Sequence, residues 1–458
     1  MRIYNTLFCV LALAFCPVNG FGQEDAWVSP EGPAVAVDWD GDDVMNHLPE
    51  YVRQVSALIQ IDLDGQIDLD EQWDNELIAP KSNIAADVDA DADESASDAA
   101  EEEELEQEKE EVPVAKPRRA LSPEAEKLRE QITGTLAAGA RRPLEVQRDT
   151  PASVIAYCFA YGADTQIFQV TQPQPQPASG QRRPQQPQAT GRAPIFAIGA
   201  LCWNYPSGGK TLLRTDGENI IAKVGPGLQR KPGTLLAMLA MSSIAENYEI
   251  RVGNTTGTIA DLVQAEKVAC ALDADMSLAL IGLSFYCDVE EEWTNDLGEK
   301  WSISKIVLAE LLRPADQGTS NITDQLLGLA CAVRRFENEG VELTGPMLDA
   351  KNYLESFEKF AVTAQNEQGL WHPRFFLFKG STPNQWDALY SSGHIFRFLA
   401  FSLPEEKLTD PQVVRSVRAL TDLINKVANT PPTTERQVEA LATALHAIAI
   451  YNMRLGEN

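Results

Sequence analysis

Residues 278–286 read LALIGLSFY, and residues 350–364 read AKNYLESFEKFAVTA. The first stretch is apolar on nearly every side, which is typical of a helix that is buried all round. The second stretch places its apolar residues three and four positions apart, so that they form one stripe on a helix. The two kinds of helix alternate from about residue 122. This alternation predicts an inner ring of helices wrapped by an outer ring.

Six such pairs are predicted, each with an outer helix followed by an inner one. Their ranges are about 122–138 with 152–161, 195–203 with 234–243, 259–271 with 277–287, 303–312 with 323–336, 347–365 with 392–402, and 412–428 with 438–452. Capping residues such as Ser302 precede several of them. The long linker of the second pair predicts a β-hairpin at 211–224 around Asp216-Gly217. We expect the ends of the series to meet, with pair one packed on pair six.

The net charge of −29 is concentrated near the N-terminus. Residues 23–112 hold 29 Asp and Glu against three basic residues, whereas residues 113–458 carry only −4. Residues 80–120 combine this charge with almost no large apolar side chains, so they cannot bury enough surface to offset chain entropy. We therefore expect a disordered acidic linker at 80–120, an acidic segment at 23–79 before it, and one folded domain at 121–458.

Residues 1–22 have the pattern of a secretory signal peptide. Arg2 precedes an apolar run at 7–16, which is too short to span a bilayer, and small residues follow. We expect cleavage close to residue 22 and an exported protein, periplasmic or extracellular, without stable membrane insertion. Lipid attachment at Cys16 is the alternative, although bulky Phe15 stands where such sites usually carry a small residue.

The segment 58–71 (LIQIDLDGQIDLDE) supports two interpretations. As a calcium loop that begins at Gln60, it has an unusual first position but places four carboxylates at EF-hand ligand positions, namely Asp62, Asp64, Asp68 and Glu71. As a β-hairpin, it alternates apolar and polar residues on both sides of an Asp64-Gly65 turn. Because only the hairpin explains the alternation, we favour it and keep calcium as the alternative.

Residues 171–194 (TQPQPQPASGQRRPQQPQATGRAP) contain six prolines and seven glutamines, which predicts an extended surface insertion. Five cysteines follow the signal segment, and we expect each to be a buried apolar residue inside a helix. They are Cys158, Cys202, Cys270, Cys287 and Cys331. They form no C-x-x-C pattern, and no two histidines lie four residues apart, so the sequence predicts neither a metal site nor a cofactor.

The fifth outer helix ends in Gln365-Asn-Glu-Gln-Gly369-Leu-Trp371, and Gly298-Glu-Lys-Trp301 is a partial echo. This motif resembles the Q-x(2–5)-G-x-W repeat of squalene-hopene cyclases and, more broadly, of the α/α-toroid superfamily that includes terpenoid cyclases and protein prenyltransferases. The resemblance covers about residues 121–455. It implies an all-α fold, an α/α toroid of about six helical hairpins with small β-hairpin insertions, in an exported bacterial protein. It also implies structural roles for Gln365, Gly369 and Trp371 as a clamp between neighbouring helix pairs.

The chemistry of that superfamily is not implied, because its catalytic motifs are incomplete here. The run nearest to the acidic D-x-D-D motif is Asp273-Ala-Asp275-Met276, which lacks the second half. We find no Asp, Cys and His zinc set of the prenyltransferase type and no C-G-E-Q thioester. The resemblance therefore extends to the fold alone.

Candidate ligand-binding residues gather in the predicted connections from outer to inner helices. These connections place the N-termini of the inner helices around one mouth of the ring, where helix dipoles favour anions. Arg230 and Lys231 lie in the second connection. The longest connection, 366–391, and the helix after it supply a mixed set that is typical of ligand sites: His372, Arg374, Asp387, Tyr390 and His394. The alternative is that both histidines only pair with backbone in a long loop.

We predict a non-catalytic binding or scaffolding protein whose ligand is anionic or a glycan. A nucleic-acid partner is not expected, because the chain lacks a basic stripe rich in aromatic residues. The alternative function is a glycan-active hydrolase or lyase, which requires two carboxylates at the mouth. The candidates for that chemistry are Asp387, Asp273, Asp275 and His394.

Overall fold

The computed structural model describes residues 122–170, 192–217, 219–313, 319–428 and 430–456. These residues belong to a single unit. Several predictions fall outside them: the signal peptide at 1–22, the hairpin or calcium loop at 58–71, the acidic linker at 80–120, and most of the insertion at 171–194.

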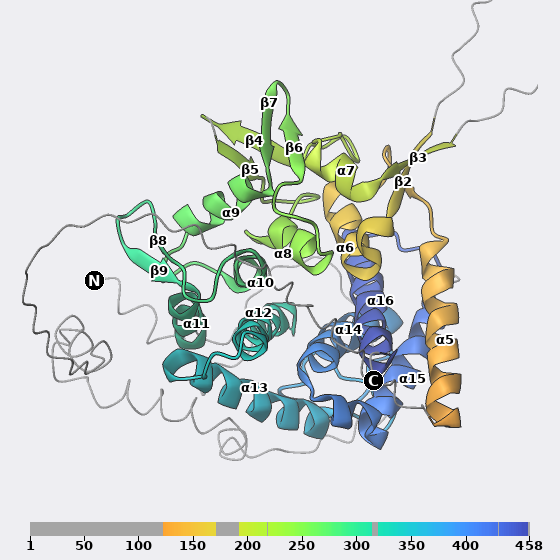
Figure 1. Ribbon diagram of the computed structural model, residues 1–458. Coiled ribbons are helices and arrows are strands. Elements are labelled where there is room, and N and C mark those ends of the chain that lie inside the picture. Colours follow the sequence, from red (N-terminus) through yellow and green to blue (C-terminus); the bar gives the residue numbers. More distant parts are fainter. Residues whose placement is uncertain (1–121, 171–191, 218, 314–318, 429, 457–458) are drawn as a thin grey trace, which may run out of the picture. The chain divides into compact units, whose positions relative to one another are not determined.

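The described part of the chain is mostly helical, with twelve α-helices in six consecutive pairs (Figure 1). We call the first helix of each pair outer and the second inner. The outer helices are α5 (Pro123–Ala140), α7 (Ala197–Cys202), α9 (Ile259–Val268), α11 (Ile303–Leu312), α13 (Gly345–Ala364) and α15 (Pro411–Val427). The inner helices are α6 (Pro151–Tyr161), α8 (Thr234–Met241), α10 (Ser277–Tyr286), α12 (Thr319–Asn338), α14 (Gln385–Ser402) and α16 (Glu435–Gly456).

The inner helices contact one another in a closed series. Helix α6 packs on α8, α8 on α10, α10 on α12, α12 on α14, and α14 on α16, which returns to α6. Outer helix α5 packs on α15 and α16, so the first pair meets the sixth, as the sequence predicted. The apolar inner helices supply much of the core, because their side chains are covered on several sides.

Glycines allow neighbouring inner helices to approach closely. A Cβ atom at Gly328 in α12 would fall well inside van der Waals contact with the carbonyl oxygen of Ser277 in α10. A Cβ atom at Gly393 in α14 would lie 3.0 Å from the backbone nitrogen of Ala444 in α16. Both positions therefore exclude a larger side chain unless the helices move apart.

Small β elements decorate the helices. Strands β1 (Leu144–Glu145), β2 (Gln166–Val170) and β3 (Arg192–Phe196) form one sheet, with β1 parallel and β3 antiparallel to β2. Three antiparallel hairpins follow: β4 (Leu213–Asp216) with β5 (Asn219–Ala222), β6 (Glu249–Val252) with β7 (Thr255–Thr258), and β8 (Glu292–Thr294) with β9 (Lys300–Ser302). The sequence predicted the first hairpin and missed the other two.

Three local predictions were wrong. Residues 192–194 belong to β3 and not to the Pro/Gln-rich insertion, because they pair with β2. Helix α14 begins at Gln385, seven residues before the predicted start, since the Asn384 side chain caps it by accepting a hydrogen bond from the Trp386 N–H. Cys270 and Cys287 lie just beyond helix ends, although both are buried as expected.

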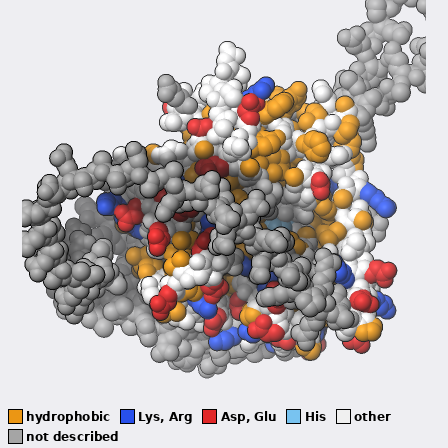
Figure 2. All heavy atoms as spheres, viewed as in Figure 1, with side chains coloured by type: hydrophobic (Ala, Val, Ile, Leu, Met, Phe, Trp, Pro, Cys, Tyr) orange, Lys and Arg blue, Asp and Glu red, His pale blue; other side chains and the backbone are white. Residues whose placement is uncertain are grey.

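The surface differs from one element to another. Figure 2 shows hydrophobic side chains gathered over α7 and the neighbouring strands, whereas acidic and basic side chains line the outward face of α5. In the described part of the chain, no helix has the length and apolar character needed to cross a membrane.

Candidate ligand site

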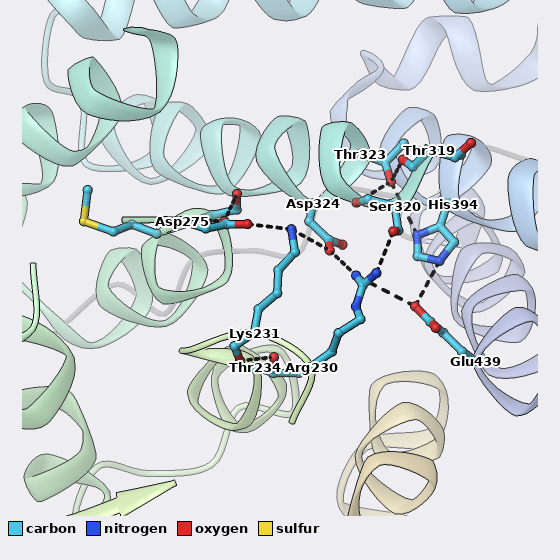
Figure 3. A network of polar contacts seen from close by, with 12 residues as sticks. Arg230, Lys231, Thr234, Asp275, Thr319, Ser320, Thr323, Asp324, His394 and Glu439 are labelled. Carbon is cyan, nitrogen blue, oxygen red and sulfur yellow. Dashed lines mark hydrogen bonds and ion pairs between the residues drawn. The ribbon is translucent and has the colours of Figure 1, made fainter. Parts of the chain in front are cut away.

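A buried carboxylate at the start of α12 organises the charged residues of the inner helices (Figure 3). Asp324 is almost fully buried and accepts hydrogen bonds from Arg397 at 2.6 Å and Arg230 at 2.8 Å. The Lys231 ammonium lies 3.5 Å from the same carboxylate. Burial alone would raise the pKa of Asp324, but the three cations outweigh it and hold that pKa well below its usual range.

Two elements bring these three cations together. Arg397 lies on α14, where it is the one charged residue in the apolar run from Ile395 to Phe401. Arg230 and Lys231 immediately precede α8, whose N-cap Gly233 adopts a left-handed conformation with φ of 74°. A Cβ atom there would clash with the backbone of Ala279 in α10. Glycine therefore permits the turn that carries both cations to Asp324.

On one side, the network continues towards α10 and α11. Lys231 Nζ lies 2.9 Å from Asp275, and the Arg313 guanidinium lies 3.2 Å from the same carboxylate. Arg313 also pairs with buried Glu310 at 2.6 Å. Burial opposes ionisation of Asp275, yet the neighbouring Lys231 charge wins and lowers its pKa. Asp275 is therefore ionised and paired with both Lys231 and Arg313.

On the other side, the network reaches α16 through Glu439. The Glu439 carboxylate lies 3.5 Å from His394 Nε2 and 3.8 Å from the Arg230 guanidinium. The other His394 nitrogen, Nδ1, is 3.4 Å from the Thr323 hydroxyl. Burial lowers the pKa of His394, despite the opposing effect of Glu439, so the imidazole is neutral near pH 7.

The edge of the network is formed by Tyr390, Arg436 and Asp387. The Arg436 guanidinium stacks over the Tyr390 ring at 4.6 Å and lies 3.5 Å from the Asp387 carboxylate. Tyr390 also packs against His394, with ring centroids 4.6 Å apart. Tyr390 therefore links the exposed arginine to the buried part of the network.

The N-termini of two inner helices receive carboxylates from the chain itself. Glu266 of α9 accepts a hydrogen bond from the Gly233 N–H at the start of α8, at 2.9 Å. Glu310 of α11 accepts one from the Met276 N–H at the start of α10, at 2.8 Å. The sequence analysis expected these helix starts to favour anions. At α8 and α10, carboxylates of the chain itself take that place and accept hydrogen bonds from backbone donors that helices leave unpaired.

The structure brings most of the sequence-predicted site residues to this network. Five residues take part in it or border it: Arg230, Lys231, Asp275, Tyr390 and His394. Asp387 reaches its edge through Arg436. Asp387 and Tyr390 were predicted in the connection 366–391, but they are residues of α14, because that helix starts early. Asp273 is instead exposed on the turn before α10.

His372 and Arg374 form a local cluster in the loop before α14. The Arg374 guanidinium stacks over Phe378 at 4.5 Å, and the His372 ring packs on the same side chain. The Arg374 N–H donates to His372 Nδ1 at 3.1 Å. Burial, followed by the Arg374 charge, lowers the pKa of His372. This loop touches the start of α12, where the Thr319 hydroxyl donates to the Pro373 carbonyl.

Gln365 and Trp371 are buried beside helix ends. The Gln365 amide donates to the Gln412 carbonyl at 3.2 Å and to the Ser416 hydroxyl, which connects the end of α13 to α15. The Trp371 indole N–H donates to the Ala361 carbonyl at 2.7 Å. Gly369 between them has φ of 91° and packs against the backbone of Arg415, so a side chain would be strained and crowded there.

Sequence reasoning missed the residues at the centre of the network, namely Asp324, Arg397, Glu310 and Glu439. The position of Arg397 inside an apolar helix indicated a buried ion pair, because a buried charge needs a partner. The partner itself could not be read, since Asp324 is 73 residues away in the sequence.

Two further features bear on ligands. In the described ranges, no group of three or more His, Cys, Asp or Glu residues is arranged to hold a metal ion. A cavity of ≈ 890 Å³ lies between α5 and α15, with Leu128, Arg418 and Leu423 in its lining, and the network contributes none of its lining residues.

Comparison with known proteins adds no relative. No protein-family model matches the chain, and no curated protein or solved structure gives a significant match.

Proposed function

We propose that this chain is an exported, non-catalytic binding or scaffolding protein built as an α/α toroid of six helical hairpins. The closed series of contacts from α6 through α16 and back to α6 supports the toroid. The apolar run that follows Arg2 supports export. The ligand binds at the mouth where the N-termini of the inner helices converge.

The observation that carries this proposal is the ionic network that extends from buried Asp324 to the partly exposed side chains of Arg230 and Glu439. Contacts from four inner-helix regions fix these side chains, so a ligand would meet a preorganised set of donors and acceptors. Such a set is characteristic of specific recognition sites.

The protonation states favour binding over acid–base chemistry. A general acid needs a raised pKa to hold its proton near neutral pH. The pKa values of Asp275 and Glu439 are instead lowered, because neighbouring cations or His394 outweigh burial. Burial raises the pKa of Glu266 and of Glu310, but both carboxylates are engaged at helix N-termini.

A glycan-active hydrolase or lyase is the second candidate function. Two partly exposed carboxylates at the mouth, Asp387 and Glu439, carry it, because Arg436 lies one turn before Glu439 on α16 and pairs with Asp387. Paired carboxylates separated by about 5–10 Å are what glycoside hydrolysis requires.

The test is a screen of the full-length protein against a library of small polar metabolites and oligosaccharides. Saturation-transfer NMR detects binding, and mass spectrometry of the recovered ligand detects turnover. We expect a ligand that binds, returns unchanged and is lost in Glu439→Gln. The matched control is Glu339→Gln, which removes an exposed carboxylate next to α12. Cleavage that disappears in Asp387→Asn or Glu439→Gln would establish the hydrolase or lyase, and binding that survives both substitutions would exclude the mouth.

A further inference from the structure

The charges of the ionic network balance. The ion-paired cations are Arg230, Lys231, Arg313, Arg397 and Arg436, and the ion-paired carboxylates are Asp275, Glu310, Asp324, Asp387 and Glu439. His394 adds no charge near pH 7, because burial keeps it neutral. Any charged ligand, anionic or cationic, would therefore meet as many carboxylates as cations. The network offers no net charge to neutralise.

The contacts differ between the interior and the rim. The buried pairs Asp324–Arg397 and Glu310–Arg313 are both 2.6 Å long. At the rim, Glu439 lies 3.5 Å from the His394 imidazole and 3.8 Å from the Arg230 guanidinium, and Arg436 lies 3.5 Å from Asp387. Charge-assisted hydrogen bonds prefer about 2.7–2.9 Å. Glu439 and Arg436 therefore retain hydrogen-bonding capacity that the interior side chains have already used. Arg230 already donates to Ser320 at 2.6 Å and to Asp324 at 2.8 Å, so it offers only its remaining N–H groups.

Exposure follows the same division. The side chain of Arg436 is 65% exposed, that of Arg230 is 42% exposed, and that of Glu439 is 30% exposed. Arg397 and Asp324, by contrast, are 6% and 3% exposed. The rim thus presents guanidinium donors and a carboxylate acceptor side by side, because Arg436 and Glu439 are one turn apart on α16 and Arg230 faces Glu439.

A hydroxyl group both donates and accepts hydrogen bonds, so a neutral molecule with adjacent hydroxyls matches such a mixed rim. We propose that the mouth binds a neutral saccharide, an assignment that rests on the binding function proposed above. Glu439 accepts a hydrogen bond from one hydroxyl of the sugar. Arg436 and Arg230 donate to the oxygens of its neighbours.

Tyr390 makes this arrangement rigid. Its ring lies under the Arg436 guanidinium and against His394, whose Nε2 faces Glu439. The donor and the acceptor on α16 are therefore held through one aromatic side chain on α14. Because Arg436 covers Tyr390, the sugar meets the polar edge of the guanidinium and not the tyrosine ring.

The experiment is isothermal titration calorimetry on the full-length protein. The neutral probes are hexasaccharides of glucose in α- and β-linkage, of xylose and of mannose. The charged probes are hexagalacturonate and the hexamer of chitosan. We expect at least one neutral probe to bind and neither charged probe to bind more tightly. Arg436→Gln and Glu439→Gln should each raise the Kd at least tenfold, because each removes a hydrogen bond to a charged group.

The controls are Arg335→Gln and Glu339→Gln, which remove an ion pair of 2.9 Å between a half-buried arginine and an exposed glutamate at the end of α12 and should leave the Kd unchanged. Circular dichroism and thermal melting establish that each variant is folded, which is expected for the largely exposed Arg436. Failure of every neutral probe to bind would overturn the saccharide proposal, as would neutral binding that is insensitive to both rim variants. Tighter, rim-dependent binding of a charged probe would overturn the proposal that the ligand is neutral while leaving the binding function intact.

Discussion

Glu266 and Glu310 occupy the same position, the eighth residue, of two successive outer helices, and each accepts a hydrogen bond from the backbone N–H of the N-cap residue of the preceding inner helix. The Glu266 bond reaches Gly233, and the Glu310 bond reaches Met276. In both cases, an outer helix supplies the cap for the inner helix of the pair before it. This contact links consecutive pairs by satisfying donors that would otherwise be unpaired in the core.

The Glu266 contact predicts a pH dependence of stability. Burial raises the pKa of Glu266 to about 7, although the bond from Gly233 opposes the shift. Since the folded pKa lies above the unfolded value, the folded state holds an extra proton between these values. The stabilisation is complete below the unfolded pKa and is lost as the pH rises towards 7.

We therefore expect the unfolding free energy of Glu266→Gln to fall furthest below that of the natural protein at acidic pH. The difference in unfolding free energy should change by about 3 kcal/mol between pH 4.5 and 8, because each pKa unit corresponds to about 1.4 kcal/mol. Urea unfolding at several pH values measures it, and Glu290→Gln, at an exposed carboxyl, is the control. Parallel stability curves for the natural protein and Glu266→Gln would contradict the prediction.

Asp324→Asn should be strongly destabilising. The substitution leaves Arg397, Arg230 and Lys231 next to a neutral amide, and removal of one partner from a buried ion pair typically costs about 3–5 kcal/mol. Asp387→Asn is the matched control, because that carboxylate is partly exposed and its single pair is long, so the expected loss is under about 1 kcal/mol. Guanidinium-induced unfolding separates the two, and equal losses would show that Asp324 is not the centre of the network.

Trp371→Ala should cost about 3–5 kcal/mol, since a fully buried indole and its hydrogen bond to Ala361 are both removed. Trp203→Ala, which truncates a tryptophan that is 48% exposed at the C-terminal end of α7, should cost much less. Chemical unfolding of the two variants checks this difference. If Trp371→Ala retained full stability but lost ligand binding, Trp371 would belong to a recognition surface together with His372.

The helices could be predicted because burial and helical periodicity depend on the order of apolar and polar residues within a short segment. The apolar run at 278–286 and the stripe on 350–364 both became helices of the expected kind. The start of α14 was missed because Gln385-Trp386-Asp387 is polar enough for a loop, and only the Asn384 cap reveals the helix. The missed hairpin β8–β9 has strands of only three residues, which is too short for a periodic signal.

The candidate site could be predicted only in part, for a different physical reason. Arg230 was assigned to the mouth because it lies in a connection that precedes an inner helix. Its partner Asp324 is 94 residues further along the chain, and such a pairing leaves no trace in local periodicity. Asp324 and Glu439 lie on inner helices that were expected to be buried. Because buried charges are normally paired, their positions indicated that each has a partner, but not which residue it is.

Gly328→Ala and Gly134→Ala should change stability in opposite directions. At Gly328, the new methyl group would collide with the carbonyl oxygen of Ser277, so α10 and α12 must separate at a cost of about 1–3 kcal/mol. At Gly134, in the exposed middle of α5, nothing lies within 4 Å of the new Cβ. Alanine there should stabilise the protein by about 0.5–1 kcal/mol, because glycine weakens a helix interior. Thermal and urea unfolding of both variants provide the measurement, and stabilisation by Gly328→Ala would contradict the close approach of the two inner helices.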